Sequence, residues 1–332
     1  MRTLISAAAL LALAGAAQAQ VSIYGLIDAS YGKSLLSDLQ GLDADFHSGG
    51  DNFSSEGNST TRIGFKGSYE LSPSVKANFR LETGGITSDG SISSDNLFNR
   101  QAWFGFSGAS WGEVRLGRQD SVAFQTMIDY DFNGASNGVS AGGYTGAAPW
   151  LPGRDSRSLQ YISPSFGGFT VHAAYTSGEG SDNGENFKNY YSLAGKWASG
   201  PVSVAAVYES KRADAPTAGL RAKDFYSVAG SFDFGVAKVM ASWADGGAVA
   251  AGGTGDGYML GVVAPIAGFN IGAHYAENLD DNADVKGYEL FINREIFKNT
   301  YLYGEYGNWD SGVPVLGKTK ADGFAVGVIF VF

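Results

Sequence analysis

The sequence predicts an all-β fold, a sixteen-stranded antiparallel transmembrane β-barrel whose long third loop folds into the lumen. Three observations lead to this fold class. Segments of roughly 9 to 13 residues with alternating apolar and polar side chains recur along the whole chain. Short turns and long polar loops alternate between these segments, and an export signal stands at the N-terminus.

Residues 1–19 have the three parts of a cleavable signal peptide. Arg2 is the basic start, an apolar run follows, and Ala17 and Ala19 form a small-x-small exit. The apolar run is too short to span a bilayer as a helix. We therefore expect residues 1–19 to be removed after export and residues 20–332 to form one transmembrane β-barrel domain.

The strand pattern is clearest after the first long loop. Residues 60–70 place Ile63 and Phe65 on one face and Arg62 and Lys66 on the other, and residues 75–82 repeat this alternation after a short turn. The two segments form an antiparallel hairpin. The sixteen strands are predicted at 20–33, 58–70, 75–86, 97–107, 112–120, 156–163, 168–178, 187–198, 201–211, 223–233, 235–245, 257–264, 268–278, 286–295, 299–309 and 320–332.

The connections alternate strictly in length. Long polar loops are predicted near 34–57, 87–96, 121–155, 179–186, 212–222, 246–256, 279–285 and 310–319, and short turns lie between them. An even number of strands with short turns on one side and long loops on the other is typical of an outer-membrane barrel. A soluble β-sandwich does not need this alternation, and a β-solenoid would show a fixed repeat that the sequence lacks.

Basic residues should line the interior of the barrel. A lysine or arginine at the lipid midplane costs about 2–4 kcal/mol, so Arg62, Lys66 and Arg80 are expected to face a water-filled channel. Arg154, at the start of the sixth strand, joins them. Arg100 shares the parity of lipid-facing Phe104, so its inward placement requires a bulge or a position at the rim.

The loop at 121–155 is the predicted constriction loop. Its apolar residues need burial while Asp129 and Asp131 interleave with them, and loops of this length are usually functional. A loop folded into the lumen satisfies both demands, whereas a loose surface loop does not. The predicted pore constriction opposes Arg62, Lys66, Arg80, Arg100 and Arg154 to Asp129 and Asp131. The alternative for any one arginine is a wall salt bridge with Glu82 or Glu113.

Composition argues against several other functions. The 23 basic and 33 acidic residues give a net charge of −10, which argues against a nucleic-acid partner. The chain has no cysteine, and its three histidines have no neighbouring pattern of a catalytic triad or a metal site. No enzyme activity, catalytic residue, metal or cofactor is therefore expected.

Several stretches resemble the Gram-negative general-diffusion porins of β-proteobacteria. They are Val21–Gly25 with Asp28, Thr61–Gly67, Arg80–Glu82, Asn99–Gly105, Leu116–Gln119, Tyr161–Phe169 and the terminal Phe332. The resemblance implies an outer-membrane homotrimer of sixteen-stranded barrels, each narrowed by its third loop and surrounded by lipid and lipopolysaccharide. It also implies that Phe332 is an assembly signal read by the barrel assembly machinery.

The predicted function is passive diffusion of ions and small hydrophilic solutes. The alternatives are a substrate-specific channel, for which inward Tyr301 and Tyr303 are too few, and an adhesin or receptor barrel that acts through its loops. Many of the acids lie in extracellular loops, where a Debye length of about 8 Å screens them from the constriction. The arginines therefore predict a weak anion preference despite the negative net charge.

Overall fold

The computed structural model describes residues 20–49, 56–92, 94–150, 153–178, 188–213, 222–246, 255–280 and 284–332. The predicted signal peptide, residues 1–19, lies outside the described residues. Within them, seventeen strands form one antiparallel sheet. No helix in the described ranges is both long enough and apolar enough to cross a membrane.

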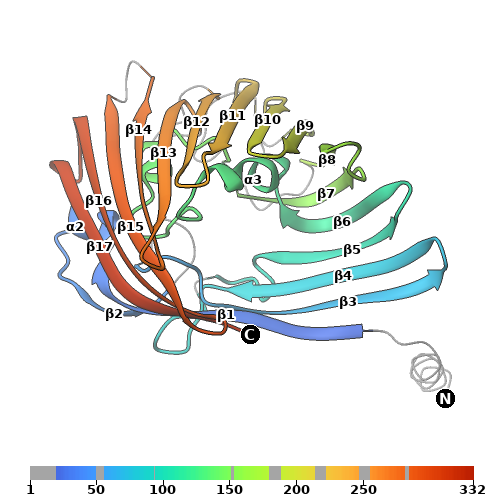
Figure 1. The fold of residues 1–332 in the computed structure, drawn as a ribbon, viewed down its shortest axis with the longest axis horizontal. Helices are drawn as coiled ribbons and strands as arrows, with labels where there is room; N and C mark the ends of the chain where they lie inside the picture. The colour runs from blue at the N-terminus through green and yellow to red at the C-terminus, as the bar shows by residue number, and fades with distance from the viewer. Residues whose placement is uncertain are drawn as a thin grey trace.

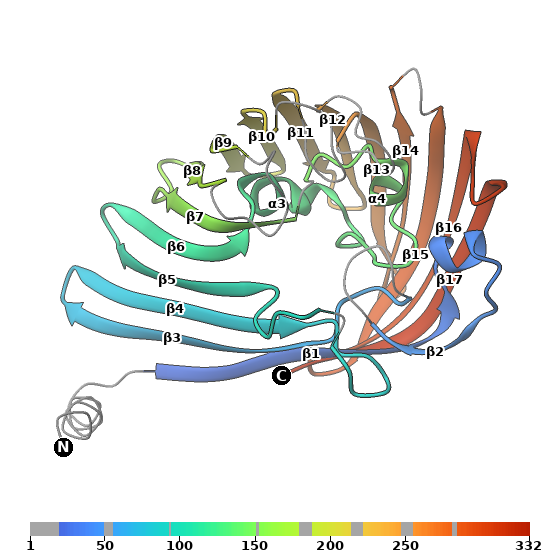
Figure 2. The same ribbon diagram turned by 180° about the vertical axis from the view of Figure 1, so that it is seen from behind.

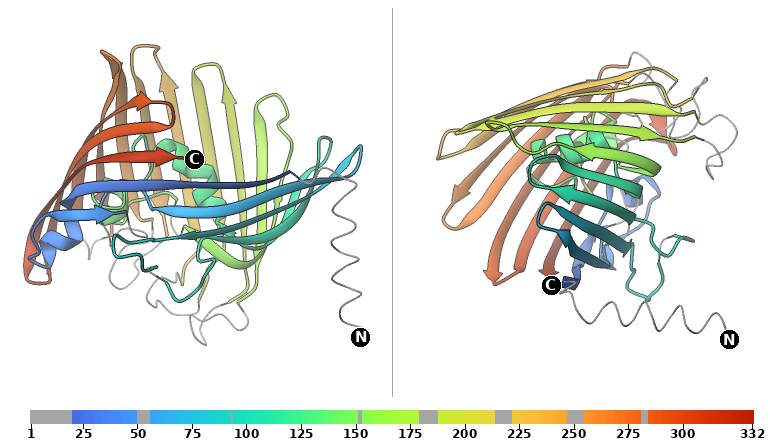
Figure 3. Two further views of the ribbon diagram at one scale, coloured as in Figure 1. Left: turned by 90° about the horizontal axis from the view of Figure 1, so that it is seen from below. Right: turned by 90° about the vertical axis from the view of Figure 1, so that its right-hand side faces the viewer.

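The strands follow one another around a ring (Figures 1 and 3). The first nine are β1 (Gln20–Lys33), β2 (Asp45–Ser48), β3 (Arg62–Ser72), β4 (Val75–Gly84), β5 (Gln101–Gly108), β6 (Gly112–Asp120), β7 (Arg154–Ile162), β8 (Phe169–Thr176) and β9 (Tyr190–Ser199). The others are β10 (Val202–Glu209), β11 (Phe225–Asp233), β12 (Lys238–Asp245), β13 (Gly257–Ile266), β14 (Phe269–Asn278), β15 (Val285–Phe297), β16 (Thr300–Val315) and β17 (Lys318–Val331).

The ring is closed by its first and last strands. Strand β1 pairs with β17, with Leu26 opposite Val331, and on its other side with β3, with Ile23 opposite Phe65. Each of the remaining long strands pairs with the next strand along the chain. The sixteen long strands confirm the predicted barrel. The short β2, which lies beside β1 from Ala29 to Gly32, was not predicted, because four residues are too few for a readable alternation.

The alternation along the strands separates a lipid face from a lumen face. Phe104, Leu116 and Leu260 point outward and are 51%, 59% and 50% exposed. The lumen side of β8 to β14 carries small buried side chains instead, which leaves room for the third loop to approach the wall. These small residues are Ala174, Ala194, Ala205, Ala229, Ala244 and Ala276.

The prediction of a long polar loop at 310–319 is wrong. Strand β16 continues to Val315 and β17 begins at Lys318, so a two-residue turn joins them. Leu316 and Gly317 in this turn have φ values of +51° and +81°, which suit a tight hairpin. The pairing continues across a register shift between Asp310 and Val315. Glycine and proline in this segment suggested a loop, yet a bulged hairpin accommodates both.

Short helices occupy the first and third loops. They are α2 (Leu35–Leu39), α3 (Val122–Met127), the 3₁₀ turn η1 (Ile128–Tyr130) and α4 (Ala141–Thr145). Each α-helix begins after a serine whose hydroxyl accepts an amide hydrogen of the first turn. Figure 2 shows α3 and α4 enclosed by the ring of strands, which confirms a third loop inside the lumen. The helices were not predicted, because five or six residues cannot show a 3.6-residue period.

Candidate functional site: the pore constriction

A cavity of about 550 Å³ lies between the third loop and the inner wall of β3 to β7. Its charged lining consists of five arginines and two carboxylates, and its third-loop side is mostly apolar. The charged residues are Arg62, Arg80, Arg100, Arg118, Arg154, Glu82 and Asp120, and the apolar ones include Phe124, Ile128, Ala135 and Trp150. The charge of this lining is therefore 5 − 2 = +3.

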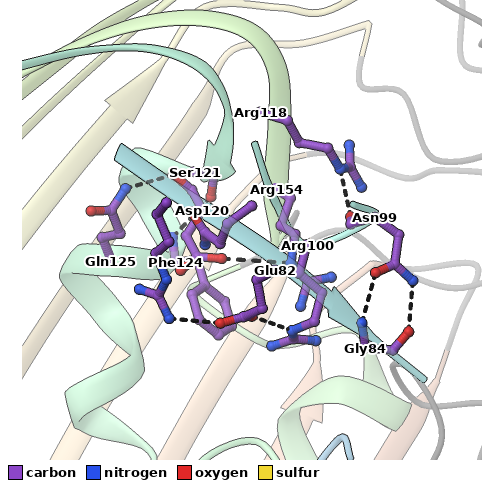
Figure 4. Close-up of polar contacts among 12 residues, drawn as sticks. Glu82, Gly84, Asn99, Arg100, Arg118, Asp120, Ser121, Phe124, Gln125 and Arg154 are labelled. Atoms are coloured by element: carbon purple, nitrogen blue, oxygen red, sulfur yellow. Dashed lines mark hydrogen bonds and ion pairs between the residues drawn. The ribbon is translucent and has the colours of Figure 1, made fainter. Parts of the chain in front are cut away.

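Glu82 on β4 joins the basic side chains of the wall (Figure 4). Its carboxylate accepts hydrogen bonds from Arg80 Nη2 and Arg100 Nε, both at 2.7 Å. The Tyr24 hydroxyl on β1 donates to the same carboxylate at 2.7 Å. The Glu82 side chain is only 2% exposed, so these charge-assisted hydrogen bonds fix the two guanidinium groups in place.

Arg100 reaches the lumen because it precedes β5. The Asn99 side chain donates to the Gly84 carbonyl at 2.8 Å and accepts from the Gly84 amide at 2.9 Å, so it substitutes for a backbone pair of the ladder. The Arg100 side chain then crosses Gly84, where an added Cβ would lie 2.3 Å from Arg100 Cδ. The sequence predicts a bulge or a rim position for Arg100, and the structure instead places it directly before the first residue of β5, outside the regular alternation of that strand.

Arg118 and Asp120 complete the cavity and were missed by sequence reasoning. Arg118 donates to the Asn99 carbonyl at 2.5 Å and to Ser156 Oγ at 2.7 Å, beside a register shift between β6 and β7. Asp120 Oδ1 lies 3.5 Å from Arg154 Nε. In a regular strand Arg118 would face lipid like Leu116, two residues before it. Because a charge in lipid is costly, the sequence indicated that the strand ends or bulges at Arg118.

Arg62 differs from the other arginines of the cavity. Its Nη1 donates to the Thr60 carbonyl at 3.4 Å, and it makes no salt bridge with another described residue. Lys66 lies outside the cavity, opposite Arg80 in the β3–β4 register, with its Nζ 5.0 Å from the Tyr24 ring. Arg62 thus lines the cavity without an ion pair among the described residues, whereas Arg80, Arg100 and Arg154 lie beside carboxylates.

The two acidic residues predicted to face the arginines do not line the cavity. Asp129 is 64% exposed and pairs with Lys196 on β9. Asp131 is fully buried against β14 and β15, on the wall side of the third loop. The predicted opposition of Asp129 and Asp131 to the arginines is thus not present, because Tyr130 between them and the neighbouring Phe132 pack against the wall. Glu82 and Asp120 supply the negative charge instead.

Comparison with known proteins supports a channel. The profile of the Gram-negative porin family matches residues 6–312. An outer membrane porin protein of Bordetella pertussis is 28% identical, covering 99% of this chain and 90% of that protein. Outer membrane porin protein 32 of Delftia acidovorans is 29% identical over 92% of this chain and 88% of its own length. The structure of an anion-selective porin from Comamonas acidovorans matches with a TM-score of 0.74 and 24% identity, covering 95% of this chain and all of that one.

The sixteen-stranded closed ring, the loop folded into its lumen and the charged cavity between them agree with these matches. The chain therefore belongs to the Gram-negative porin family and is a channel of the outer membrane, not an enzyme.

Proposed function

We propose that this porin conducts ions and small hydrophilic solutes by passive diffusion with a weak anion preference, and that Arg62, Arg80, Arg100 and Arg154 set this preference. The observation that carries the proposal is the excess of five arginines over two carboxylates around the cavity. Such a ring of cationic side chains favours anions in a narrow aqueous passage. The similar porin of Comamonas acidovorans is anion-selective, which agrees with this proposal.

The preference is weak for two structural reasons. Glu82 neutralises part of the charge of Arg80 and Arg100, and Asp120 does the same for Arg154. Arg62 remains as the guanidinium without a described carboxylate partner. The proposed filter includes Arg118 in addition to the residues predicted from the sequence, whereas Lys66 and Asp129 act only as distant charges.

A substrate-specific channel is less well supported. A channel specific for sugars should show a run of aromatic side chains along the lumen, but the Tyr303 hydroxyl donates to Asp28 at 2.8 Å and its side chain is only 5% exposed. Tyr303 is therefore part of the wall and is not available to a solute.

We also propose a homotrimer. OmpT of Vibrio cholerae, a similar barrel whose structure is of its trimer form, matches with a TM-score of 0.64 at 15% identity over 95% of this chain. The outer face of β1 is apolar and exposed in the single chain, with Val21 57%, Ile23 63% and Ile27 47% exposed. Either lipid or a neighbouring subunit would cover this face. Light scattering of the detergent-solubilised folded protein should give three chains per particle, and a monomer would contradict this part of the proposal.

The test of the selectivity proposal is reconstitution into a planar bilayer. We expect a large ohmic conductance and a zero-current potential of anionic sign under a KCl gradient. The double variant Arg62→Ala with Arg154→Ala should lose this preference, while Arg294→Ala should keep it, because Arg294 lies outside the cavity over the Phe269 ring. A parent channel without conductance, or a double variant with unchanged selectivity, would refute the proposal.

A further inference from the structure

A buried group of three titratable side chains lies behind the third loop, on the side away from the cavity. Asp131 from the loop meets His274 on β14 and Glu289 on β15, and all three side chains are 0% exposed. His274 Nδ1 lies 3.6 Å from Asp131 Oδ1 and 3.4 Å from Glu289 Oε1. None of the three lines the charged cavity, so conduction does not account for them.

The same residues hold the backbone of the loop. The Phe132 amide donates to His274 Nε2 at 3.1 Å, and the Ala141 amide donates to Glu289 Oε2 at 2.6 Å. The Asn133 amide donates to Asp131 Oδ1 at 2.9 Å. Two wall residues thus fasten the loop at two places, and Asp131 joins them from the loop itself.

The charges of this group are not balanced by a neighbouring cation. Asp131 Oδ2, Glu289 Oε1 and His274 Nδ1 are buried without a hydrogen-bond partner in the described structure. Neither carboxylate makes a salt bridge with a described lysine or arginine. Two ionised carboxylates buried together repel each other strongly, so the group must hold a cation or an additional proton.

The other charged groups around it do not change this conclusion. Lys238 on β12 lies with its Nζ 5.1 Å from the centre of the Phe132 ring, which separates it from the carboxylates. Glu305 on β16 is buried and accepts hydrogen bonds from Asn58, Asn133 and Ser136, so it adds no positive charge.

The hydrogen bond at Nε2 of His274 decides between a metal ion and a proton. Because Nε2 accepts the Phe132 amide hydrogen, its lone pair is occupied and the neutral ring carries its own hydrogen on Nδ1. Nδ1 lies 3.6 Å from Asp131 Oδ1 and 3.4 Å from Glu289 Oε1, so this hydrogen is close to both carboxylates. A ring nitrogen that carries hydrogen cannot ligate a metal, so the three residues do not fit a metal site with this ring tautomer.

We propose that the buried group of Asp131, His274 and Glu289 holds one additional proton when the third loop is docked, and that loss of this proton at rising pH loosens the loop from the wall. Asp131, His274 and Glu289 together then hold the loop in a proton-dependent way, and we call this group the latch. This inference concerns the position of the loop and goes beyond the proposed ion preference.

The direction of the pH dependence follows from the burial of Asp131. Burial raises the pKa of Asp131 to about 6 from its ordinary 3.8, and the Glu289 carboxylate acts in the same direction. A group whose pKa is raised in the docked state stabilises that state fully at low pH, and the contribution disappears as the pH rises through the docked pKa. The docking equilibrium should therefore weaken by roughly a hundredfold, most of it between about pH 4 and pH 6.

Hydrogen exchange of the folded protein tests the latch directly. The amides of Phe132 and Ala141 report the docked loop, because they donate to His274 and Glu289. After correction for intrinsic exchange, we expect their opening constant to rise roughly a hundredfold between pH 4 and pH 7. The Phe124 amide in the first turn of α3 donates to Oγ of Ser121, the residue before the helix, and serves as an internal control. Its opening constant should not change with pH. A pH-independent opening constant at Phe132 and Ala141 would overturn the proposal.

The variant Glu289→Gln distinguishes a bound proton from a bound metal ion. Glutamine removes the carboxylate charge beside Asp131 and keeps an oxygen that can accept from the Ala141 amide, so the pH dependence should decrease while protection at pH 4 persists. Glu277→Gln is the matched control, because Glu277 bonds Tyr258 and Tyr275 away from the loop and should leave the pH dependence intact. Stoichiometric Zn²⁺ binding that restores protection at pH 7 would show a metal site and overturn the proton assignment. If Glu289→Gln does not fold, the pH series of the parent still decides.

Discussion

The substitution Glu82→Gln tests whether charge balance in the cavity controls ion preference. Glutamine keeps the shape and an acceptor oxygen for Arg80 and Arg100 but removes one of the two negative charges, so the lining changes from +3 to +4. We expect the anion preference to increase. The acidic residues elsewhere on the chain stay the same, so the change in preference reports on the cavity alone.

The magnitude follows from the size of the cavity. A sphere of about 550 Å³ has a radius of about 5 Å, so one wall charge acts on a central ion with about 0.8 kcal/mol in water. Screening over a Debye length of about 8 Å roughly halves this energy. Because the change favours an anion and disfavours a cation alike, the permeability ratio should shift by about 0.9 kcal/mol, which is about fourfold.

Zero-current potentials in a KCl gradient near about 0.15 M, where this Debye length applies, measure the ratio. The control is Glu113→Gln, the same chemical change at a carboxylate that also pairs with an arginine, Arg115, at 2.6 Å but lies outside the cavity. An unchanged ratio in folded Glu82→Gln, or an equal shift in Glu113→Gln, would show that the arginines around the cavity do not form the filter.

Two further substitutions test the supports of the site, and one deletion tests assembly. Trp150→Ala removes a side chain of the third loop that is 0% exposed, so the loop packing should weaken by about 3–5 kcal/mol and single-channel conductance should become larger and noisier. Asn99→Ala removes both hydrogen bonds to Gly84 from a side chain that is 4% exposed. The melting temperature should fall by an amount equivalent to about 1–3 kcal/mol. The matched control Asn96→Ala, at an exposed loop position, should leave the melting temperature unchanged. Deletion of Phe332, whose backbone exchanges two hydrogen bonds with Gly25 at 3.0 and 3.1 Å, should reduce the heat-modifiable folded species in the outer membrane, and a normal yield would contradict its role in assembly.

The barrel could be predicted from the sequence because its physical requirement is local. Each strand needs an apolar side toward lipid, and a two-residue period shows this in any single segment, as in Ile63 and Phe65 against Arg62 and Lys66. Arg62 and Arg80 on the wall followed from the same period. Strand ends were less certain, and the hairpin at Leu316 was misread because turn-forming residues also occur in bulged strands at the rim.

The orientation of the third loop could not be predicted, because it depends on contacts between distant segments. Asp129 and Asp131 lie two residues apart, yet one pairs with Lys196 and the other with His274. The loop packs on alanines of the lumen wall, such as Ala194 and Ala205, which the alternation pattern alone does not mark as a docking face. The length and composition of residues 121–155 indicated which loop enters the lumen, but not the part of the wall on which it packs.

The pairing of β1 with β17 sets the order in which this protein can mature. Leu26 meets Val331, a partner at the opposite end of the described chain, so the backbone ladder cannot be completed until nearly all of the polypeptide has been synthesised and exported. Until then both edge strands present unpaired amide and carbonyl groups, which would template pairing with other chains. Such long-range pairing also makes folding slow. The porin therefore depends on being kept apart from its own copies for the whole interval between export and insertion.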